Sequence, residues 1–106
     1  MLHRVECVAK GLVTRGFDRG DRAALMAESC IEWVIADQAC AALGIPTVAI
    51  PTNYADSEID FILEDAKPRL IFVTKSEVLT DSMLERFAAA KVELVITLQN
   101  LSLIHI

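Results

Sequence analysis

Apolar residues along the chain form two alternating patterns, short unbroken runs and longer stretches with helical spacing. The runs hold few polar residues, as expected of strands that are covered on both faces. They span residues 23–27, 47–50, 70–73 and 92–97. Outside the runs, apolar residues recur every three or four positions, which is typical of amphipathic helices. Helices are therefore predicted over residues 5–12, 29–43, 56–66 and 76–90.

Residues that begin and end helices stand at the boundaries of these stretches. Ser29 and Glu32 have the spacing of a capping box, and Gly44 can take the left-handed conformation that closes a helix. Pro46 prevents that helix from continuing. Strands joined by crossover helices of this length pair in parallel. The sequence therefore predicts an α/β fold, a mostly parallel open sheet with helices on both faces.

Composition limits the size and the partners of this fold. A chain of 106 residues makes one small domain, and its hydrophobic fraction of 54% is high for a free-standing domain. We therefore expect neighbouring parts of a longer protein to cover some of its surface. A net charge of −5 with scattered basic residues argues against nucleic acid. No apolar stretch is long enough for a transmembrane segment, and the start has no signal-peptide layout, so a cytoplasmic location is expected.

A set of spaced residues resembles the N-terminal region of AMP-forming acyl-CoA synthetases, the adenylate-forming ligases. The set begins with Gly-Phe-x-x-Gly-Asp-Arg at 16–22 and continues with Glu-Trp at 32–33 and a strand that ends in Ile-Pro at 50–51. Glu-Ile-x-x-Ile-Leu-x-Asp-Ala at 58–66 extends it. The likeness runs in register from Val8 to Thr97 and is a pattern of spacing, with no catalytic signature inside the chain.

This resemblance implies a parent ligase that activates a carboxylic acid, expected to be a fatty acid, with ATP and Mg²⁺. The parent would form an acyl adenylate and pass the acyl group to coenzyme A. The family binds ATP through a Ser/Thr/Gly-rich loop that ends in Pro-Lys, and the chain has no counterpart of it. We therefore expect no catalytic, cofactor-binding or metal-binding residue in this piece, and no activity from it alone. Its partner would be the remainder of the parent ligase domain.

The resemblance also divides the chain. Residues 1–100 are expected to form part of the N-terminal subdomain of the parent. Residues 101–106, Leu-Ser-Leu-Ile-His-Ile, depart from the family pattern and carry apolar residues without a turn or cap. We expect these six residues to be a non-native or truncated tail.

Candidate ligand contacts follow from the predicted sheet. Ligands of open parallel sheets gather at the carboxyl ends of the strands, which directs attention to 28–29, 51–54 and 74–76. Asn53 and Tyr54 are the candidates for the rim of a substrate pocket, although such loop residues more often serve as a turn former and as rim packing.

The remaining polar residues have structural explanations. Asp21 and Arg22 precede a strand, at the edge opposite the expected ligand side, where a tight turn and a local Asp to Arg pair suffice. Cys30 and Cys40 read as small core residues of the second helix, and the histidines are confined to the two ends. A metal site is therefore not expected.

Two other classes of protein fit the alternation of helices and strands. One is a stand-alone flavodoxin-like or receiver-like binding module. A receiver, however, needs an acidic cluster after its first strand and an Asp after its third, whereas the strand 47–50 is followed by Pro51 and Thr52. The other is an interaction protein that keeps the scaffold fold and binds a partner through uncovered apolar surface.

Overall fold

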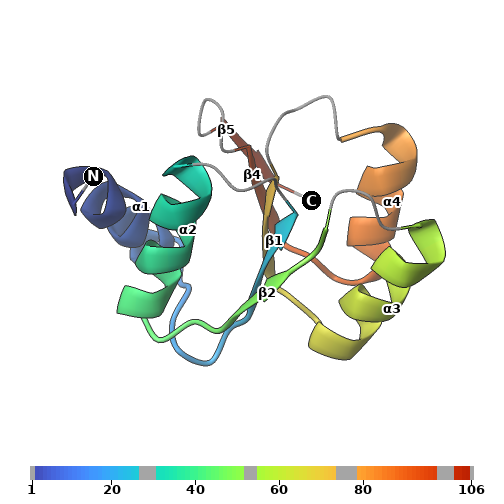
Figure 1. The fold of residues 1–106 in the computed structure, drawn as a ribbon, viewed down its shortest axis with the longest axis horizontal. Helices are drawn as coiled ribbons and strands as arrows, with labels where there is room; N and C mark the ends of the chain where they lie inside the picture. The colour runs from blue at the N-terminus through green and yellow to red at the C-terminus, as the bar shows by residue number, and fades with distance from the viewer. Residues whose placement is uncertain (1, 27–30, 52–54, 74–78, 98–101, 106) are drawn as a thin grey trace.

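In the computed structural model, the described residues form four helices and five strands in one α/β unit (Figure 1). The structure describes residues 2–26, 31–51, 55–73, 79–97 and 102–105. The helices are α1 (Leu2–Thr14), α2 (Ile31–Ala42), α3 (Asp56–Ala66) and α4 (Asp81–Ala89). The strands are β1 (Ala23–Met26), β2 (Thr47–Ala49), β3 (Leu70–Val73), β4 (Leu94–Thr97) and β5 (Ser102–His105).

The strands form a single sheet in the order β2-β1-β3-β4-β5. Strands β1 to β4 are parallel, with Leu25 aligned to Phe72 and Phe72 aligned to Ile96. This confirms the predicted open and mostly parallel sheet. Strand β5 was not predicted. It lies antiparallel beside β4 and falls within residues 101–106, whose non-native origin stays a prediction.

Alternate residues of the parallel strands face two different helix layers. Figure 1 shows α1 and α2 on one side of the sheet and α3 and α4 on the other. Leu25 and Phe72 pack with α1 and α2, whereas Met26 and Val73 pack with α3 and α4. Strands β1, β3 and β4 are buried along their whole length. Both faces are therefore covered, as the unbroken apolar runs predicted.

The first two helices end at glycines that take left-handed backbone conformations. Gly16 follows α1 with a φ of 85°, and Gly44 follows α2 with a φ of 72°. The amide of Ile45 donates to the carbonyl of Cys40 and completes the second of these caps. The prediction for Gly44 is confirmed.

The fourth helix begins later than predicted. The sequence placed its start at Ser76, which lies outside the described residues, but residues 79–80 are not helical and α4 begins at Asp81. The physical reason is the Thr80 side chain, which accepts a hydrogen bond from the Met83 amide and caps the helix there. Likewise, the proposed Ser29 cap of α2 lies outside the described residues.

Opposite effects are expected from replacing Gly44 and Gly11 with alanine. A Cβ at Gly44 would lie 3.2 Å from the Cβ of Arg19 and would be forced into a left-handed backbone, so Gly44→Ala should lower the free energy of unfolding by roughly 1–2 kcal/mol. Gly11 lies inside α1, where an added Cβ has room, so Gly11→Ala should raise it by about 0.5–1 kcal/mol. Urea denaturation of both variants measures this. A Gly44→Ala variant as stable as the parent chain would contradict the assigned cap.

Candidate functional site

The carboxyl ends of the parallel strands meet at one edge of the sheet. Met26 is aligned with Val73, and Val73 with Thr97, so three strands end at the same level. Helix α2 connects β1 to its neighbour β2 on one side, and α3 then leads back past β1 to β3 on the other side. The direction in which strands are added to the sheet therefore reverses between β1 and β3. In open α/β sheets this switch point is where ligands bind. The geometry therefore places a candidate ligand site beyond the ends of β1 and β3.

The residues predicted for this edge follow the strand ends. Asn53 and Tyr54, the predicted pocket rim, lie outside the described residues, as do the candidate positions 28–29 and 74–76. The structure does describe the buried strand residues next to this edge. Met26, Ile50 and Val73 are buried and belong to one apolar cluster directly beneath the edge. A rigid apolar floor of this kind can hold loops in place but supplies no reactive group.

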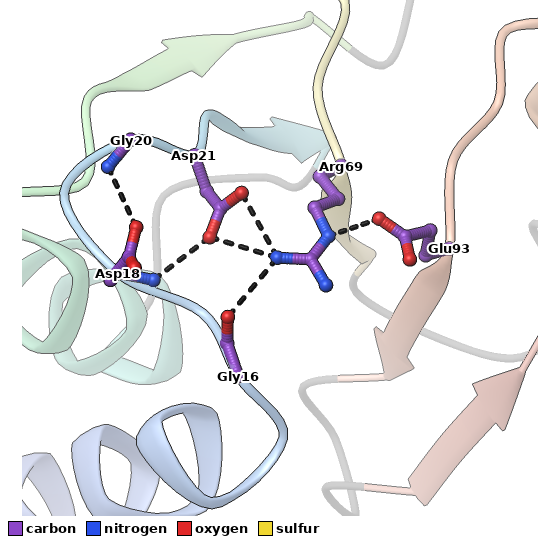
Figure 2. A network of polar contacts seen from close by, with 6 residues as sticks. All are labelled: Gly16, Asp18, Gly20, Asp21, Arg69 and Glu93. Atoms are coloured by element: carbon purple, nitrogen blue, oxygen red, sulfur yellow. Dashed lines mark hydrogen bonds and ion pairs between the residues drawn. The ribbon is translucent and has the colours of Figure 1, made fainter.

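The opposite edge of the sheet is held by a polar network around Arg69 (Figure 2). Its Nη1 donates to both carboxylate oxygens of Asp21 at 3.0 Å and to the Gly16 carbonyl at 3.2 Å. Its Nε donates to the Glu93 carboxylate. The guanidinium also lies 4.4 Å from the centre of the Phe17 ring. These contacts raise the pKa of Arg69, first through Glu93 and then through Asp21, so the side chain stays charged.

The role of Arg69 was not predicted, although the sequence contains a signal for it. Asp21, Arg69 and Glu93 stand just before β1, β3 and β4, so a parallel sheet brings them to one edge. The tight turn at 18–21 is confirmed, because the Gly20 amide donates to the Asp18 carboxylate and the Asp18 amide to that of Asp21. The local Asp to Arg pair is wrong, since Asp21 pairs with Arg69.

A second network holds the two helices on the α3 and α4 face. Arg86 of α4 forms ion pairs with Asp60 and, at 3.0 Å, with Asp56 of α3. The acceptor carboxylates are largely exposed, so we expect this network to contribute less than the one around Arg69. Both networks join elements that are distant in the sequence, which is a structural task.

The described residues contain no metal-binding cluster, and the buried thiol among them belongs to the core. No group of three His, Cys, Asp or Glu side chains in that part of the chain could hold a metal ion. Cys40 is fully buried, and burial, with a smaller effect of Asp37, raises the pKa of its thiol to about 12. This thiol stays protonated and serves as a core residue, as predicted. Cys30 lies outside the described residues.

Within the described ranges, the search for membrane spans finds no helix with the length and apolar character needed to cross a bilayer. The longest, α1, has 13 residues.

Comparisons with known proteins agree with this architecture. The family model described as "AMP-binding enzyme" matches residues 1–104. The chain belongs to the AMP-binding enzyme family. The family match separates the chain from flavodoxin-like and receiver-like modules, which the strand order 2-1-3-4 does not do by itself because it also occurs in flavodoxin-like sheets.

Individual relatives of this family piece are acyl-CoA ligases. The acyl-CoA ligase SID4 of Ajellomyces capsulatus is 36% identical over 66 residues, which are 62% of this chain and 11% of the relative. The putative acyl-CoA synthetase YngI of Bacillus subtilis is 32% identical over 68 residues, 64% of this chain and 12% of the relative. The chain therefore spans only about an eighth or less of these two relatives.

The structural comparison gives the same result for the fold. The O-succinylbenzoate coenzyme A synthetase of Bacillus subtilis, solved with ATP and a magnesium ion, superimposes with a TM-score of 0.76 and 25% identity. The match covers 94% of this chain and 26% of that protein. This AMP-binding family piece is thus a small part of an acyl-CoA ligase fold.

Replacing Arg69 tests the structural role of its network. Arg69→Gln removes the charge that Asp21 and Glu93 share, so we expect the free energy of unfolding to fall by roughly 1–2 kcal/mol in low salt. Arg86→Gln is the matched control, and its more exposed ion pairs predict a smaller loss that salt reduces further. Chemical denaturation at two salt concentrations measures both. Equal losses would contradict the special position of Arg69.

Proposed function

We propose that this chain is the scaffold portion of a ligase that activates a carboxylic acid with ATP and Mg²⁺ and transfers the acyl group to coenzyme A. One observation carries the proposal. The chain superimposes over 94% of its length on a synthetase solved with ATP and magnesium, yet accounts for 26% of it. The parent's remaining residues would then supply most of the site.

The chemistry of the parent divides accordingly. ATP would supply the adenylate that makes the carboxyl carbon reactive, and coenzyme A would supply the thiol that accepts the acyl group. This chain would place its strand ends, and the loops that carry Asn53 and Tyr54, beside the substrate. Fatty acids are the substrate class that we favour, since a relative in Arabidopsis thaliana is named long chain acyl-CoA synthetase 2.

Several features support a framework role for the isolated chain. Its four glycines, at 11, 16, 20 and 44, form no phosphate-binding loop. The best-connected polar side chain of the described part, Arg69, holds secondary structure together. The partner in this proposal is the rest of the ligase domain. Cys7 and Cys40 form no disulfide, which supports a place for the parent in the reducing cytoplasm.

A pyrophosphate-release assay tests the division between scaffold and chemistry. The purified chain is incubated with ATP, Mg²⁺, coenzyme A and a panel of acids from acetate to palmitate. We expect no turnover above the rate without protein, because the chain carries no loop to bind the phosphates of ATP. A full-length acyl-CoA ligase in parallel shows that the assay works. Acid-dependent pyrophosphate release by the chain alone would disprove the framework role.

A further inference from the structure

An open depression of about 940 Å³ lies at the amino edge of the sheet, between α3 and α4. Five cationic side chains line it, and three of them, from three separate segments, are considered first. Arg22 comes from the turn before β1, Lys67 follows α3, and Lys91 follows α4. This edge is opposite the carboxyl ends of the strands, so the depression is distinct from the site considered above.

These three cations differ from the other two that line the depression. Arg69 and Arg86 each form ion pairs with two carboxylates, so their charges already have partners within the chain. Among the described residues, the Arg22 side chain donates to the Ala66 carbonyl at 3.0 Å and forms no ion pair, and neither lysine forms an ion pair with a carboxylate there. All three are exposed, so their charges are available to a ligand.

The unpaired carboxylates of the depression lie further along the helices. Glu64 is three residues before Lys67, and Glu85 is six residues before Lys91. Since a helix rises about 1.5 Å per residue, Glu64 is set back from Lys67 by about 4.5 Å along the helix axis, and Glu85 is set back further from Lys91. The end of the depression nearest the sheet therefore carries three cations without an ion pair, and the carboxylate that lines this end, Asp21, is paired with Arg69, within a chain whose net charge is −5.

The backbone at both lysines is in the region that normally favours glycine. Lys67 has a φ of 49° and Lys91 a φ of 64°. The equivalent positions after α1 and α2 are occupied by Gly16 and Gly44. The helix dipole favours a cation near each helix end. The dipole does not explain why lysine occupies the left-handed position after α3 and α4, the two helices that border the depression. Glycine occupies that position after α1 and α2.

We propose that this cationic end binds a small multivalent phosphate anion through Arg22, Lys67 and Lys91. Two lysines supply point charges and the arginine a planar pair of donors, a combination suited to phosphate oxygens. The net negative charge of the chain disfavours extended polyanions. The same chemistry occurs in free pyrophosphate and in the diphosphate of a nucleotide. This inference does not depend on the proposed ligase role.

Calorimetric titration of the whole chain with pyrophosphate, at constant ionic strength set with NaCl, tests the proposal. Saturable binding is expected. Lys67→Asn/Lys91→Asn should weaken it at least about tenfold, because asparagine tolerates the left-handed backbone but carries no charge. Lys67→Arg/Lys91→Arg keeps both charges and should stay within about threefold. Lys10→Asn, at an exposed position in α1, is the matched control and should change nothing.

The outcomes separate cleanly. Loss in the asparagine pair with retention in the arginine pair supports the site, and parallel titration with ADP shows whether a nucleotide diphosphate binds more tightly than free pyrophosphate. The proposal is overturned if the heat of pyrophosphate binding does not saturate. It is also overturned if titration with NaCl at equal ionic strength gives the same heat. Saturable binding that the asparagine pair leaves unchanged also overturns it, because the anion then binds elsewhere. Circular dichroism of each variant confirms that the fold is kept.

Discussion

Burial of both faces of β1, β3 and β4 is the constraint on which the rest of this structure depends. Every residue of the three strands is apolar or buried, so the sheet requires a helix layer on each side. The crossover helices supply both layers and, since right-handed crossovers keep the strands parallel, bring all their carboxyl ends to one edge. The location of a ligand edge is therefore a consequence of packing.

Burial of both sheet faces also determines where polar interactions can form. A sheet covered on both faces leaves charged side chains only at its edges and on the outer helix surfaces. Arg69 uses this position at the amino edge, where it reaches the segments that lead into β1 and β4. Backbone bonds continue the connection, because the Arg69 amide donates to the Arg22 carbonyl and the Glu93 amide to that of Arg69. Strand alignment is thus held at one edge while the other is left for ligand loops.

Local patterns predicted the elements, the parallel pairing and the covering of both faces, because these follow from periodicity and from residues such as Gly44. The Asp21 to Arg69 pair joins residues 48 positions apart and depends on strand alignment, so no local pattern contained it. The start of α4 was missed because Ser76 and Thr80 are both good caps by residue type. Strand β5 depends on a neighbour, β4, which only the folded sheet supplies. For the candidate site, the sequence predicted the edge, whereas Asn53 and Tyr54 remain predictions.

Native-state amide hydrogen exchange on the isolated chain tests the central claim, that the sheet is a cooperative framework in its own right. The account predicts that amides of Leu25, Phe72 and Ile96, in the three buried strands, exchange only by global unfolding, with one common opening free energy equal to that from denaturation. Amides of the edge strand β2 should exchange through smaller openings. Exchange of the Phe72 amide as fast as that of Val48 in β2 would contradict the account.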